Sequence, residues 1–384
     1  MSSFSFDAVN LPPGVPEFRS TVRAFLRREI ADLPPHRRVN PWGVFDAEFS
    51  RKLAAQGWIG MTWPAQYGGG ERSAIERYVL LEELLAAGAP VGAHWIADRQ
   101  SGPALLKYGT EEQRRAYLPG MARGEIFCCI GMSEPNAGSD LASVRTRAEK
   151  LPDGRWKING QKVWTTQAHR CRLMIALIRT GGYDEKAKQV GLSQFLLELD
   201  TPGITVRPIV DLVGESHFCE VFFQDAIVPA TSILGNEGDG WKQCTSELSL
   251  ERSGPERYMS SMAVYLEFIK AAGPRPSESV SQALGKVAAE IWTLRQMSLS
   301  VAGQLAAGKD PAIEAAIVKD LGNSFEQSLP TLVQTLTDAG LDLSQAGDLA
   351  RTLASLLQVS PSFSLRGGTR EILRGIIARG LGLR

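Results

Sequence analysis

The spacing of apolar residues changes twice along this chain of 384 residues, and these changes limit the folds that are possible. Residues 18–30 carry apolar side chains at helical spacing with arginines between them. A second helical run covers residues 74–87. Thr110, which is followed by two acidic residues, is a typical N-cap residue directly before the first turn of a helix. We therefore expect the first third of the chain to be helical.

From about Cys128 the pattern becomes that of short strands. Six segments are rich in β-branched or aromatic residues: Trp156–Ile158, Gln161–Trp164, Leu173–Ile178, Phe195–Leu199, Ile204–Val206 and Glu220–Phe223. Good turn sequences at Pro152–Gly154 and Asn159–Gly160 lie between them. This arrangement predicts an antiparallel sheet or a small barrel.

Helical spacing returns after Gly240–Trp241. An apolar stripe runs through residues 284–297, and a last apolar run at 372–377 is flanked by arginines. The order helical, β, helical predicts an α+β protein with a helical region at each end of the sequence. A chain of this length favours two or three domains.

Composition gives no reason to propose a nucleic acid partner, although it leaves a local basic patch open, and no apolar run is long enough for a membrane span. Lysine plus arginine equals aspartate plus glutamate at 42 each, so no nucleic acid partner is indicated. The longest clear apolar run, Leu173–Ile178, is far too short to span a bilayer. The five cysteines form no CxxC pair, and the N-terminus has no basic region followed by an apolar run. We expect a soluble, cytoplasmic protein with reduced cysteines.

Two runs carry the most functional information. Met132–Asp140 puts small, turn-forming residues and two hydroxyls where backbone can approach a flat polar ligand. Gly160–Thr166 ends a strand with an aromatic ring and two further hydroxyls. Such a pocket suits an isoalloxazine. Each run alone is more often a plain turn or a core strand, so the prediction depends on their order and spacing.

Together, the two runs resemble the flavin-binding face of the acyl-CoA dehydrogenase family, and the order of helical and β regions is similar over essentially the whole chain. The resemblance implies an α+β fold with three domains. These are an N-terminal helical domain (1–127), a middle antiparallel β domain (128–235) and a C-terminal helical bundle (236–384). It also implies FAD as cofactor.

The implied reaction converts an acyl-CoA thioester to a 2,3-enoyl-CoA. A base takes the α-proton, flavin N5 takes the β-hydride, and an electron-transfer flavoprotein receives the electrons. By this resemblance the residues that contact the flavin are Met132, Ser133, Ser139, Trp164, Thr165, Thr166, Thr369 and Glu371. Ser139 would also contact the pantetheine arm of CoA. Hydrogen-bond donors at the ring edge would stabilise the reduced flavin.

The residue that acts as the catalytic base is harder to assign. Many family members carry a glutamate directly before a Gly-Thr pair near the C-terminus, and here that position is Gly367. Other members carry the base in a Leu-x-x-Glu-Arg-like run, which Leu248–Arg252 matches. The resemblance therefore implies Glu251 as the base, with Arg252 shaping the pocket and the Gly367 N–H binding the thioester carbonyl. Glu247 and Glu256 are rivals. Arg366 either indicates a polar or bulky acyl group or lies on the surface.

The half of the cofactor site that a neighbouring subunit provides in the family is poorly matched. Ala271–Pro274 stands where family members have an Arg-x-x-Phe-Gly run, and Asp338–Asp342 is not a Gly-Gly-x-Gly turn. A similar combination occurs in heterotetrameric members (two copies of each chain) that act on steroid side chains. The implied partner is a second acyl-CoA dehydrogenase-like subunit, and self-association remains the alternative.

Two other functions remain open. A flavin oxidase or monooxygenase on the same fold differs in the access of oxygen to N5, which the sequence does not reveal. A non-catalytic subunit of a heteromeric acyl-CoA dehydrogenase would explain why the commoner base position is Gly367. Acyl length and branching are not readable, because one methylene changes discrimination by only ~1–3 kcal/mol.

Overall fold

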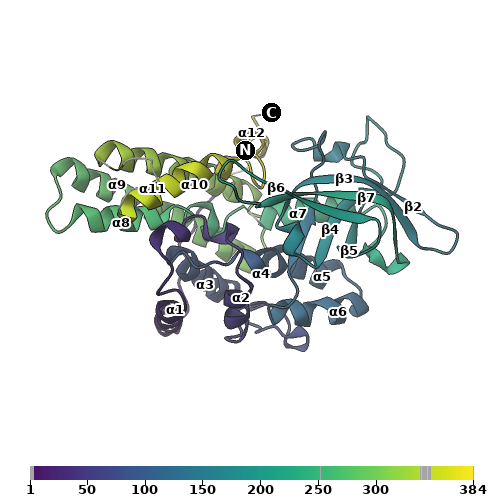
Figure 1. The fold of residues 1–384 in the computed structure, drawn as a ribbon, viewed down its shortest axis with the longest axis horizontal. Helices are drawn as coiled ribbons and strands as arrows, with labels where there is room; N and C mark the ends of the chain where they lie inside the picture. Colours follow the sequence, from purple (N-terminus) through teal and green to yellow (C-terminus); the bar gives the residue numbers. More distant parts are fainter. Residues whose placement is uncertain (1–3, 251, 338, 340–343, 345–346, 384) are drawn as a thin grey trace. The chain divides into compact units, whose positions relative to one another are not determined.

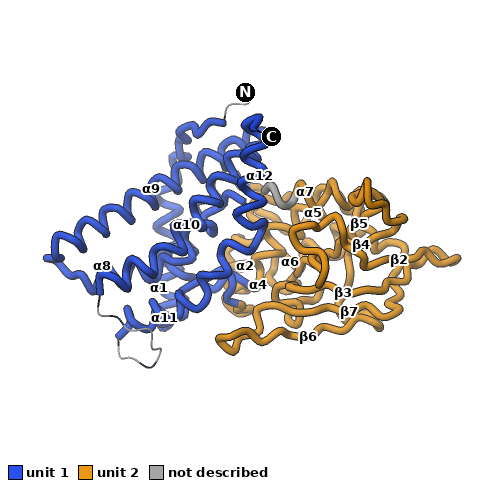
Figure 2. Tube along the Cα trace, turned by 90° about the horizontal axis from the view of Figure 1, so that it is seen from above, with its two compact units in different colours: residues 1–44, 72–92, 249–384 blue, residues 45–71, 93–248 orange. Residues whose placement is uncertain are grey.

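The computed structural model describes residues 4–250, 252–337, 339, 344 and 347–383. Helices come first and last along the chain and a sheet lies between them in sequence (Figure 1), which confirms the predicted fold class. The chain forms two compact units, coloured separately in Figure 2. Unit 1 comprises residues 1–44, 72–92 and 249–384, and unit 2 comprises residues 45–71 and 93–248.

Unit 1 is helical. Its helices are α1 (Val15–Glu29), α3 (Ala74–Ala86), α8 (Met262–Ala272), α9 (Glu278–Ala306), α10 (Ala312–Leu336), α11 (Asp348–Val359) and α12 (Arg370–Gly380). The buried carboxylate of Glu82 on α3 pairs with Arg19 on α1 and, at 2.5 Å, with Arg295 on α9. Arg23 binds the neighbouring Glu83 at 2.7 Å. These ion pairs join three helices, because one carboxylate accepts from two guanidinium groups.

The loop before α12, residues 365–369, is held by hydrogen bonds from Lys319 on α10. The Lys319 side chain is fully buried, and its ammonium donates to the carbonyl oxygens of Arg366 and Gly368. Gly367 and Gly368 have φ values of 64° and 96°, in the left-handed region that favours glycine. The lysine thus binds both sides of Gly367, the residue at the commoner base position of the family.

Arg366 points into unit 1. Its guanidinium lies 3.8 Å from the ring centre of Trp42 and donates to Asn40 Oδ1 at 3.0 Å and Ser260 Oγ at 3.3 Å. Its side chain is 18% exposed. Arg366 is therefore not a solvated surface arginine, and the inference of a polar or bulky acyl group stays a prediction. Stacking on an aromatic face stabilises a buried guanidinium.

Glu326 on α10 lies beside this guanidinium. One carboxylate oxygen accepts from the Ser260 N–H at 2.6 Å, and the other is 3.9 Å from Arg366 Nη2. The side chain has no solvent exposure. Burial raises the pKa of Glu326 to about 7, against the lowering influence of Arg366 and the hydrogen bond from Ser260. This carboxyl group therefore holds its proton far above the pH at which a solvated glutamate loses it.

Unit 2 is built around a sheet. Its strands are β1 (Cys128–Gly131), β2 (Arg147–Lys150), β3 (Trp156–Thr166), β4 (Leu173–Arg179), β5 (Leu192–Glu198), β6 (Ile204–Ile209), β7 (Phe218–Val228) and β8 (Ile233–Leu234). The order is β6-β7-β3-β2-β4-β5-β8, and β1 pairs with β4. The helices of this part of the chain are α2 (Ala47–Ala54), α4 (Gly92–Ile96), α5 (Gly102–Tyr108), α6 (Glu111–Ala122) and α7 (Gly240–Leu250).

The sheet differs from the prediction in three respects. Two predicted segments form the single strand β3, and Asn159–Gly160 lies inside it at a register shift rather than in a turn. Long pairing with β7 overrides the local turn preference. The sheet is mixed rather than wholly antiparallel, because β4 pairs in parallel with β1 and, at one position, with β2. Strands β1, β2 and β8 are additional to the six predicted segments.

Strand β4 is buried on both faces. One set of side chains, with Met174 and Ala176, packs among β3, β5 and β7 residues. The alternate set, with Leu173 and Ile175, packs against α5 and α6, which lie along that face of the sheet (Figure 1). Thr110 is the N-cap of α6 (Glu111–Ala122), as predicted, and its hydroxyl accepts from the N–H of Gln113 at 3.2 Å. The continuous apolar run in the sequence reflects this double coverage.

Gly240 starts α7 in close contact with β5. A Cβ atom at this position would lie 2.6 Å from the Cα and carbonyl carbon of Ser193. Main-chain atoms in a paired strand cannot move aside easily, so only glycine allows this approach. Helices resume at Gly240, as the sequence predicts. The close contact fixes the start of the helix that ends at Leu250, directly before Glu251.

We predict that Gly240→Ala destabilises the protein by about 1–3 kcal/mol, because the added methyl group overpacks the contact with Ser193. The matched control is Gly285→Ala on α9, where a Cβ meets no atom within 4 Å. A helical glycine with free space gains ~0.5–1 kcal/mol on replacement by alanine. Guanidinium unfolding midpoints measure both changes. Equal effects of the two variants would contradict the proposed contact.

We predict that Glu326→Gln stabilises the protein increasingly as the pH rises from about 5 to 8. The folded-state pKa of about 7 exceeds the value of 4.5 for a free glutamate. The wild type therefore loses stability as the pH rises through this window, and the neutral amide does not. The gain should approach ~1–3 kcal/mol above pH 7. Unfolding curves at several pH values measure it, and a difference independent of pH would contradict the raised pKa.

Candidate functional site

The first predicted flavin segment is a short connection tied to β3. The carbonyl of Ser133 accepts from the Val163 N–H at 2.9 Å, and Glu134 and Ala137 close a tight turn through two main-chain hydrogen bonds. Met132 and Ser133 are half-buried, and Ser139 is exposed. Within the described part of the chain, the Ser133 and Ser139 hydroxyls have no hydrogen-bond partner. They are therefore available to a ligand at this surface of unit 2.

The second predicted segment is the end of β3, where the strand is irregular. The pairing with β7 shifts between Lys162 and Thr165, and Trp164 has a φ of 59°. A left-handed conformation is uncommon for an aromatic residue and turns its side chain out of the regular alternation. The Trp164 side chain is 59% exposed, with Phe218 edge-on at 6.0 Å between ring centres.

The two threonines after Trp164 differ in access. Thr165 is fully buried, and its hydroxyl has no hydrogen-bond partner among the described residues. Thr166 is half-buried. At this end of β3, the open indole and the half-buried Thr166 hydroxyl are the groups that a ligand can reach without a change in conformation.

A buried ion pair joins the two segments. The ammonium of Lys162 donates to Glu134 Oε1 at 2.8 Å and to the carbonyl of Met132 at 3.0 Å. Burial lowers the pKa of Lys162 to about 8, although Glu134 acts in the opposite direction. Burial alone would raise the pKa of Glu134, but Lys162 and the hydrogen bonds from residues 145 and 146 outweigh it and lower the pKa.

Sequence reasoning did not identify Lys162 or Glu134 as site residues. A lysine in an amphipathic strand usually points to solvent, and a glutamate before a proline is usually part of an exposed turn. The available signal was weak: Lys162 stands in a strand next to the predicted flavin residues, and Glu134 stands inside the other predicted segment. Only the tertiary contact makes the pair visible.

The remaining predicted residues belong to unit 1, and the structure brings several of them together. A Cβ atom at Gly368 would lie 4.0 Å from Arg252 Nη2, so the residue after Glu251 reaches the Gly367–Gly368 turn. Thr369 is the residue before the first turn of α12, and Glu371 is exposed in that turn. Its own main-chain N–H and the Thr369 hydroxyl lower the pKa of Glu371.

The predicted base, Glu251, lies outside the described residues, as does the side chain of its rival Glu247. The other rival, Glu256, is fully buried, and its carboxylate lies 3.4 Å from Arg257 Nε. A carboxylate enclosed beside a guanidinium does not meet a ligand at the surface. Of the turn at Asp338–Asp342, the structure describes only Ala339.

The surface at Ala271–Pro274 offers little positive charge. The nearby Lys270 pairs with Glu267 at 2.6 Å, and Arg275 is exposed beyond the end of α8. A phosphate-binding turn needs donors directed at one point. This connection between α8 and α9 has one lysine already engaged and one arginine on an open loop.

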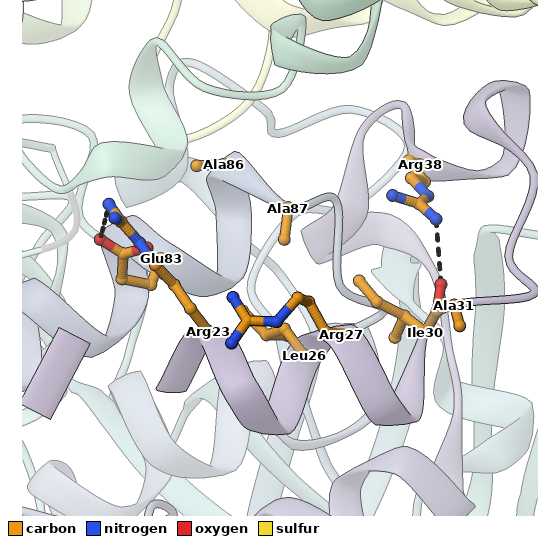
Figure 3. Close-up of a pocket in the computed structure, with 9 residues that line it drawn as sticks. All are labelled: Arg23, Leu26, Arg27, Ile30, Ala31, Arg38, Glu83, Ala86 and Ala87. Carbon is orange, nitrogen blue, oxygen red and sulfur yellow. Dashed lines mark hydrogen bonds and ion pairs between the residues drawn. The ribbon is translucent and has the colours of Figure 1, made fainter. Parts of the chain in front are cut away.

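A surface hollow of about 450 Å³ lies elsewhere in unit 1, beside α1 and α3 (Figure 3). Its floor is apolar, with Leu26 and Ile30, and Arg23, Arg27 and Arg38 line it. Arg23 is engaged by Glu83, and Arg38 donates to the carbonyl of Ile30. None of the predicted flavin, substrate or base residues lines this hollow.

Among the described residues, no cluster of histidine, cysteine, aspartate and glutamate side chains has the arrangement of a metal site. None of the helices described combines the length and apolar character that a membrane crossing requires.

Comparison with known proteins gives consistent matches. Residues 15–125, 129–226 and 238–382 match the N-terminal, middle and C-terminal domain families of acyl-CoA dehydrogenases. Acyl-CoA dehydrogenase IpdE1 of Mycolicibacterium smegmatis is 33% identical over 96% of this chain and 98% of its own length. A structure of the Tcur3481–Tcur3483 steroid ACAD has a TM-score of 0.86 at 28% identity, covering 97% of this chain and 98% of that one.

The ChsE4–ChsE5 complex from Mycobacterium tuberculosis contains a similar chain, with a TM-score of 0.83 at 27% identity over 98% of this chain and 100% of that chain. The matched domains cover nearly the whole sequence and follow the observed order of helical, β and helical regions. This chain belongs to the acyl-CoA dehydrogenase family, whose members are FAD-dependent oxidoreductases acting on acyl-CoA thioesters.

Proposed function

We propose that this chain catalyses α,β-dehydrogenation of an acyl-CoA thioester to a 2,3-enoyl-CoA, with Glu251 as the base. The observation that carries the proposal is the approach of Arg252 to the Gly367–Gly368 turn. Gly367 occupies the commoner base position of the family and has no side chain. A carboxylate that replaces the missing base must approach the same turn, and the residue next to Glu251 in sequence does so.

The residues of unit 2 fit the ring of FAD. Trp164 presents an open aromatic face in a backbone conformation that costs energy, and such strain is concentrated at functional sites. Ser133 and Thr166 add half-buried hydroxyls at the two connected segments. Met132, Ser133, Trp164 and Thr166 would hold the ring edge, with Thr165 packed behind them. When bound, FAD supplies the hydride acceptor that α,β-dehydrogenation requires.

The protein groups act on the thioester. The Glu251 carboxylate takes the α-proton, and the Gly367 N–H donates to the thioester carbonyl, which stabilises the negative charge that develops there. Arg252 lies beside the same turn and would shape the pocket. Ser139 would contact the pantetheine arm, and Thr369 and Glu371 would lie along the ribityl and phosphate region. The family suggests an electron-transfer flavoprotein as electron acceptor.

We also propose that the chain is the catalytic subunit of a hetero-oligomer with a second acyl-CoA dehydrogenase-like chain. The weak positive charge near Ala271–Pro274 supports this, because Lys270 is engaged by Glu267. Two of the similar structures are the Tcur3481–Tcur3483 steroid ACAD and the ChsE4–ChsE5 complex. By analogy we propose the CoA thioester of a steroid side chain as the substrate class. A non-catalytic role remains the second candidate, and Gly367 favours it.

We predict that Glu251→Gln lowers turnover by about 10²–10⁴-fold, because a neutral amide cannot take the α-proton. The readout is anaerobic bleaching of the flavin by a panel of acyl-CoAs in the assembled complex. Glu247→Gln, one helical turn earlier, is the control and should keep nearly full turnover. Unchanged turnover in Glu251→Gln would remove the base assignment and favour the non-catalytic subunit.

We predict that the chain expressed alone contains little FAD, and that co-expression with the second subunit restores a stoichiometric amount. The reason is the missing phosphate-binding side of the site. Co-purification, the ratio of flavin absorbance to protein and size-exclusion chromatography measure this. An active homo-oligomer saturated with flavin would refute the hetero-oligomer. Rapid aerobic reoxidation with release of peroxide would instead favour the oxidase alternative.

A further inference from the structure

Lys162 is the centre of a buried polar cluster that the proposed chemistry does not use. The Lys162 side chain has no solvent exposure, although Lys162 lies in strand β3 among largely apolar buried residues. The ammonium donates to the Met132 carbonyl at 3.0 Å and to Glu134 at 2.8 Å. Both acceptors belong to the connection after β1, so one side chain of β3 holds two points of that connection.

Glu134 extends the attachment to the far end of the same connection. Its Oε2 accepts from the Arg145 N–H at 2.6 Å, and its Oε1 also accepts from the Thr146 N–H at 2.9 Å. Arg145 and Thr146 directly precede β2. The ion pair therefore ties the beginning and the end of residues 132–146 to β3, and it leaves neither carboxylate oxygen without a donor.

Stability alone is a weak reason for such a pair. The desolvation of two buried charges usually offsets their attraction, and apolar replacements of similar size are often as stable. The depressed pKa of Lys162 reflects this cost, because burial disfavours the charged ammonium. A buried pair that contributes little net stability is better explained by the arrangement that it enforces.

The ion pair sets the register between residues 132–134 and residues 164–166 at the end of β3. Lys162 pairs with Val221, and the register shift that exposes Trp164 comes directly after it. The next residue, Val163, donates its N–H to the Ser133 carbonyl at 2.9 Å. Lys162 and Val163 thus attach the 132–134 segment to β3 immediately before the strand becomes irregular. A slip of either segment would separate Ser133 from Trp164.

We infer that Lys162 is a positioning residue for FAD, which acts through the Met132 carbonyl and Glu134 to keep residues 132–134 in register with residues 164–166. This inference rests on the proposed function, in which these two segments border the flavin. Lys162 itself is enclosed and touches neither cofactor nor substrate. Its effect is on the relative position of the groups that do.

The test compares FAD binding with folding in the complex of this chain and its co-purified partner. Lys162→Met keeps an unbranched side chain, one atom shorter, and removes the donor. We expect the dissociation constant for FAD, measured by flavin fluorescence on titration of the apo-complex, to rise by about 10- to 100-fold. The visible spectrum of the residual bound flavin should shift, because the donors at its edge are displaced. Lys157→Met, on the same strand but in a partly exposed ion pair with Glu149 at 3.3 Å, should leave both unchanged.

A second variant separates positioning from stability. Lys162→Met leaves Glu134 as a buried charge without its cation, so that variant can also lower the melting temperature. The double variant with Glu134→Gln removes both charges and should recover most of the melting temperature of the apo-complex. It still lacks the donor to Met132, so FAD binding should remain weak. Recovery of FAD affinity and spectrum together with the melting temperature would show a purely structural role and overturn the inference.

The outcomes also distinguish this inference from the proposed function. If the wild-type complex binds FAD and Lys162→Met binds it with the same affinity and spectrum, the positioning role is wrong and the proposed function stands. If the wild-type complex binds no FAD, the proposed function fails and this inference fails with it. The FAD titration and the melting curves are both independent of turnover.

Discussion

The loops that carry the candidate site depend on buried cations that donate to main-chain carbonyl groups. Lys162 binds the carbonyl of Met132 in unit 2, and Lys319 binds those of Arg366 and Gly368 in unit 1. Arg179, which is 5% exposed, donates to four carbonyls, among them those of Ala142 and Val144. Loop carbonyls lack the partners that a helix or sheet provides, and an unpaired buried carbonyl is costly. One cation with several donors satisfies several of them and fixes their positions.

This mode of attachment matters most where the site uses backbone rather than side chains. Gly367 has only its N–H to offer a thioester carbonyl, and a main-chain donor can be directed only by fixing the chain on both sides. The carbonyls on both sides bind Lys319, and the Arg366 side chain is stacked on Trp42. The loop is thereby held at three points. Folding restricts the main chain of Gly367 and so costs conformational entropy. The contacts of Lys319 and Arg366 on either side help to offset this cost.

The sequence predicted what depends on local periodicity and missed what depends on distant contacts. The order of helices and strands and the N-cap of α6 followed from spacing and capping residues. Asn159–Gly160 reads as a turn, but pairing of β3 with β7 on both sides of it keeps the strand continuous. Lysine and arginine usually lie on the surface, and only the partners Glu134 and Trp42 explain why Lys162 and Arg366 are turned inward. The assignments to Glu251 and the flavin-edge residues remain predictions from family resemblance.

The predicted flavin segments lie in unit 2 and the Gly367–Gly368 turn lies in unit 1, and each is held by contacts within its own unit. Gly240 is packed on the backbone of Ser193 in unit 2, and Arg252 reaches the turn at Gly368 in unit 1. The helix α7 begins at Gly240 and ends at Leu250, and its hydrogen bonds set a rise of about 1.5 Å per residue. In sequence, Glu251 comes after this helix and directly before Arg252. A base at 251 therefore has, as its neighbour in sequence, a residue that reaches the turn carrying Gly367.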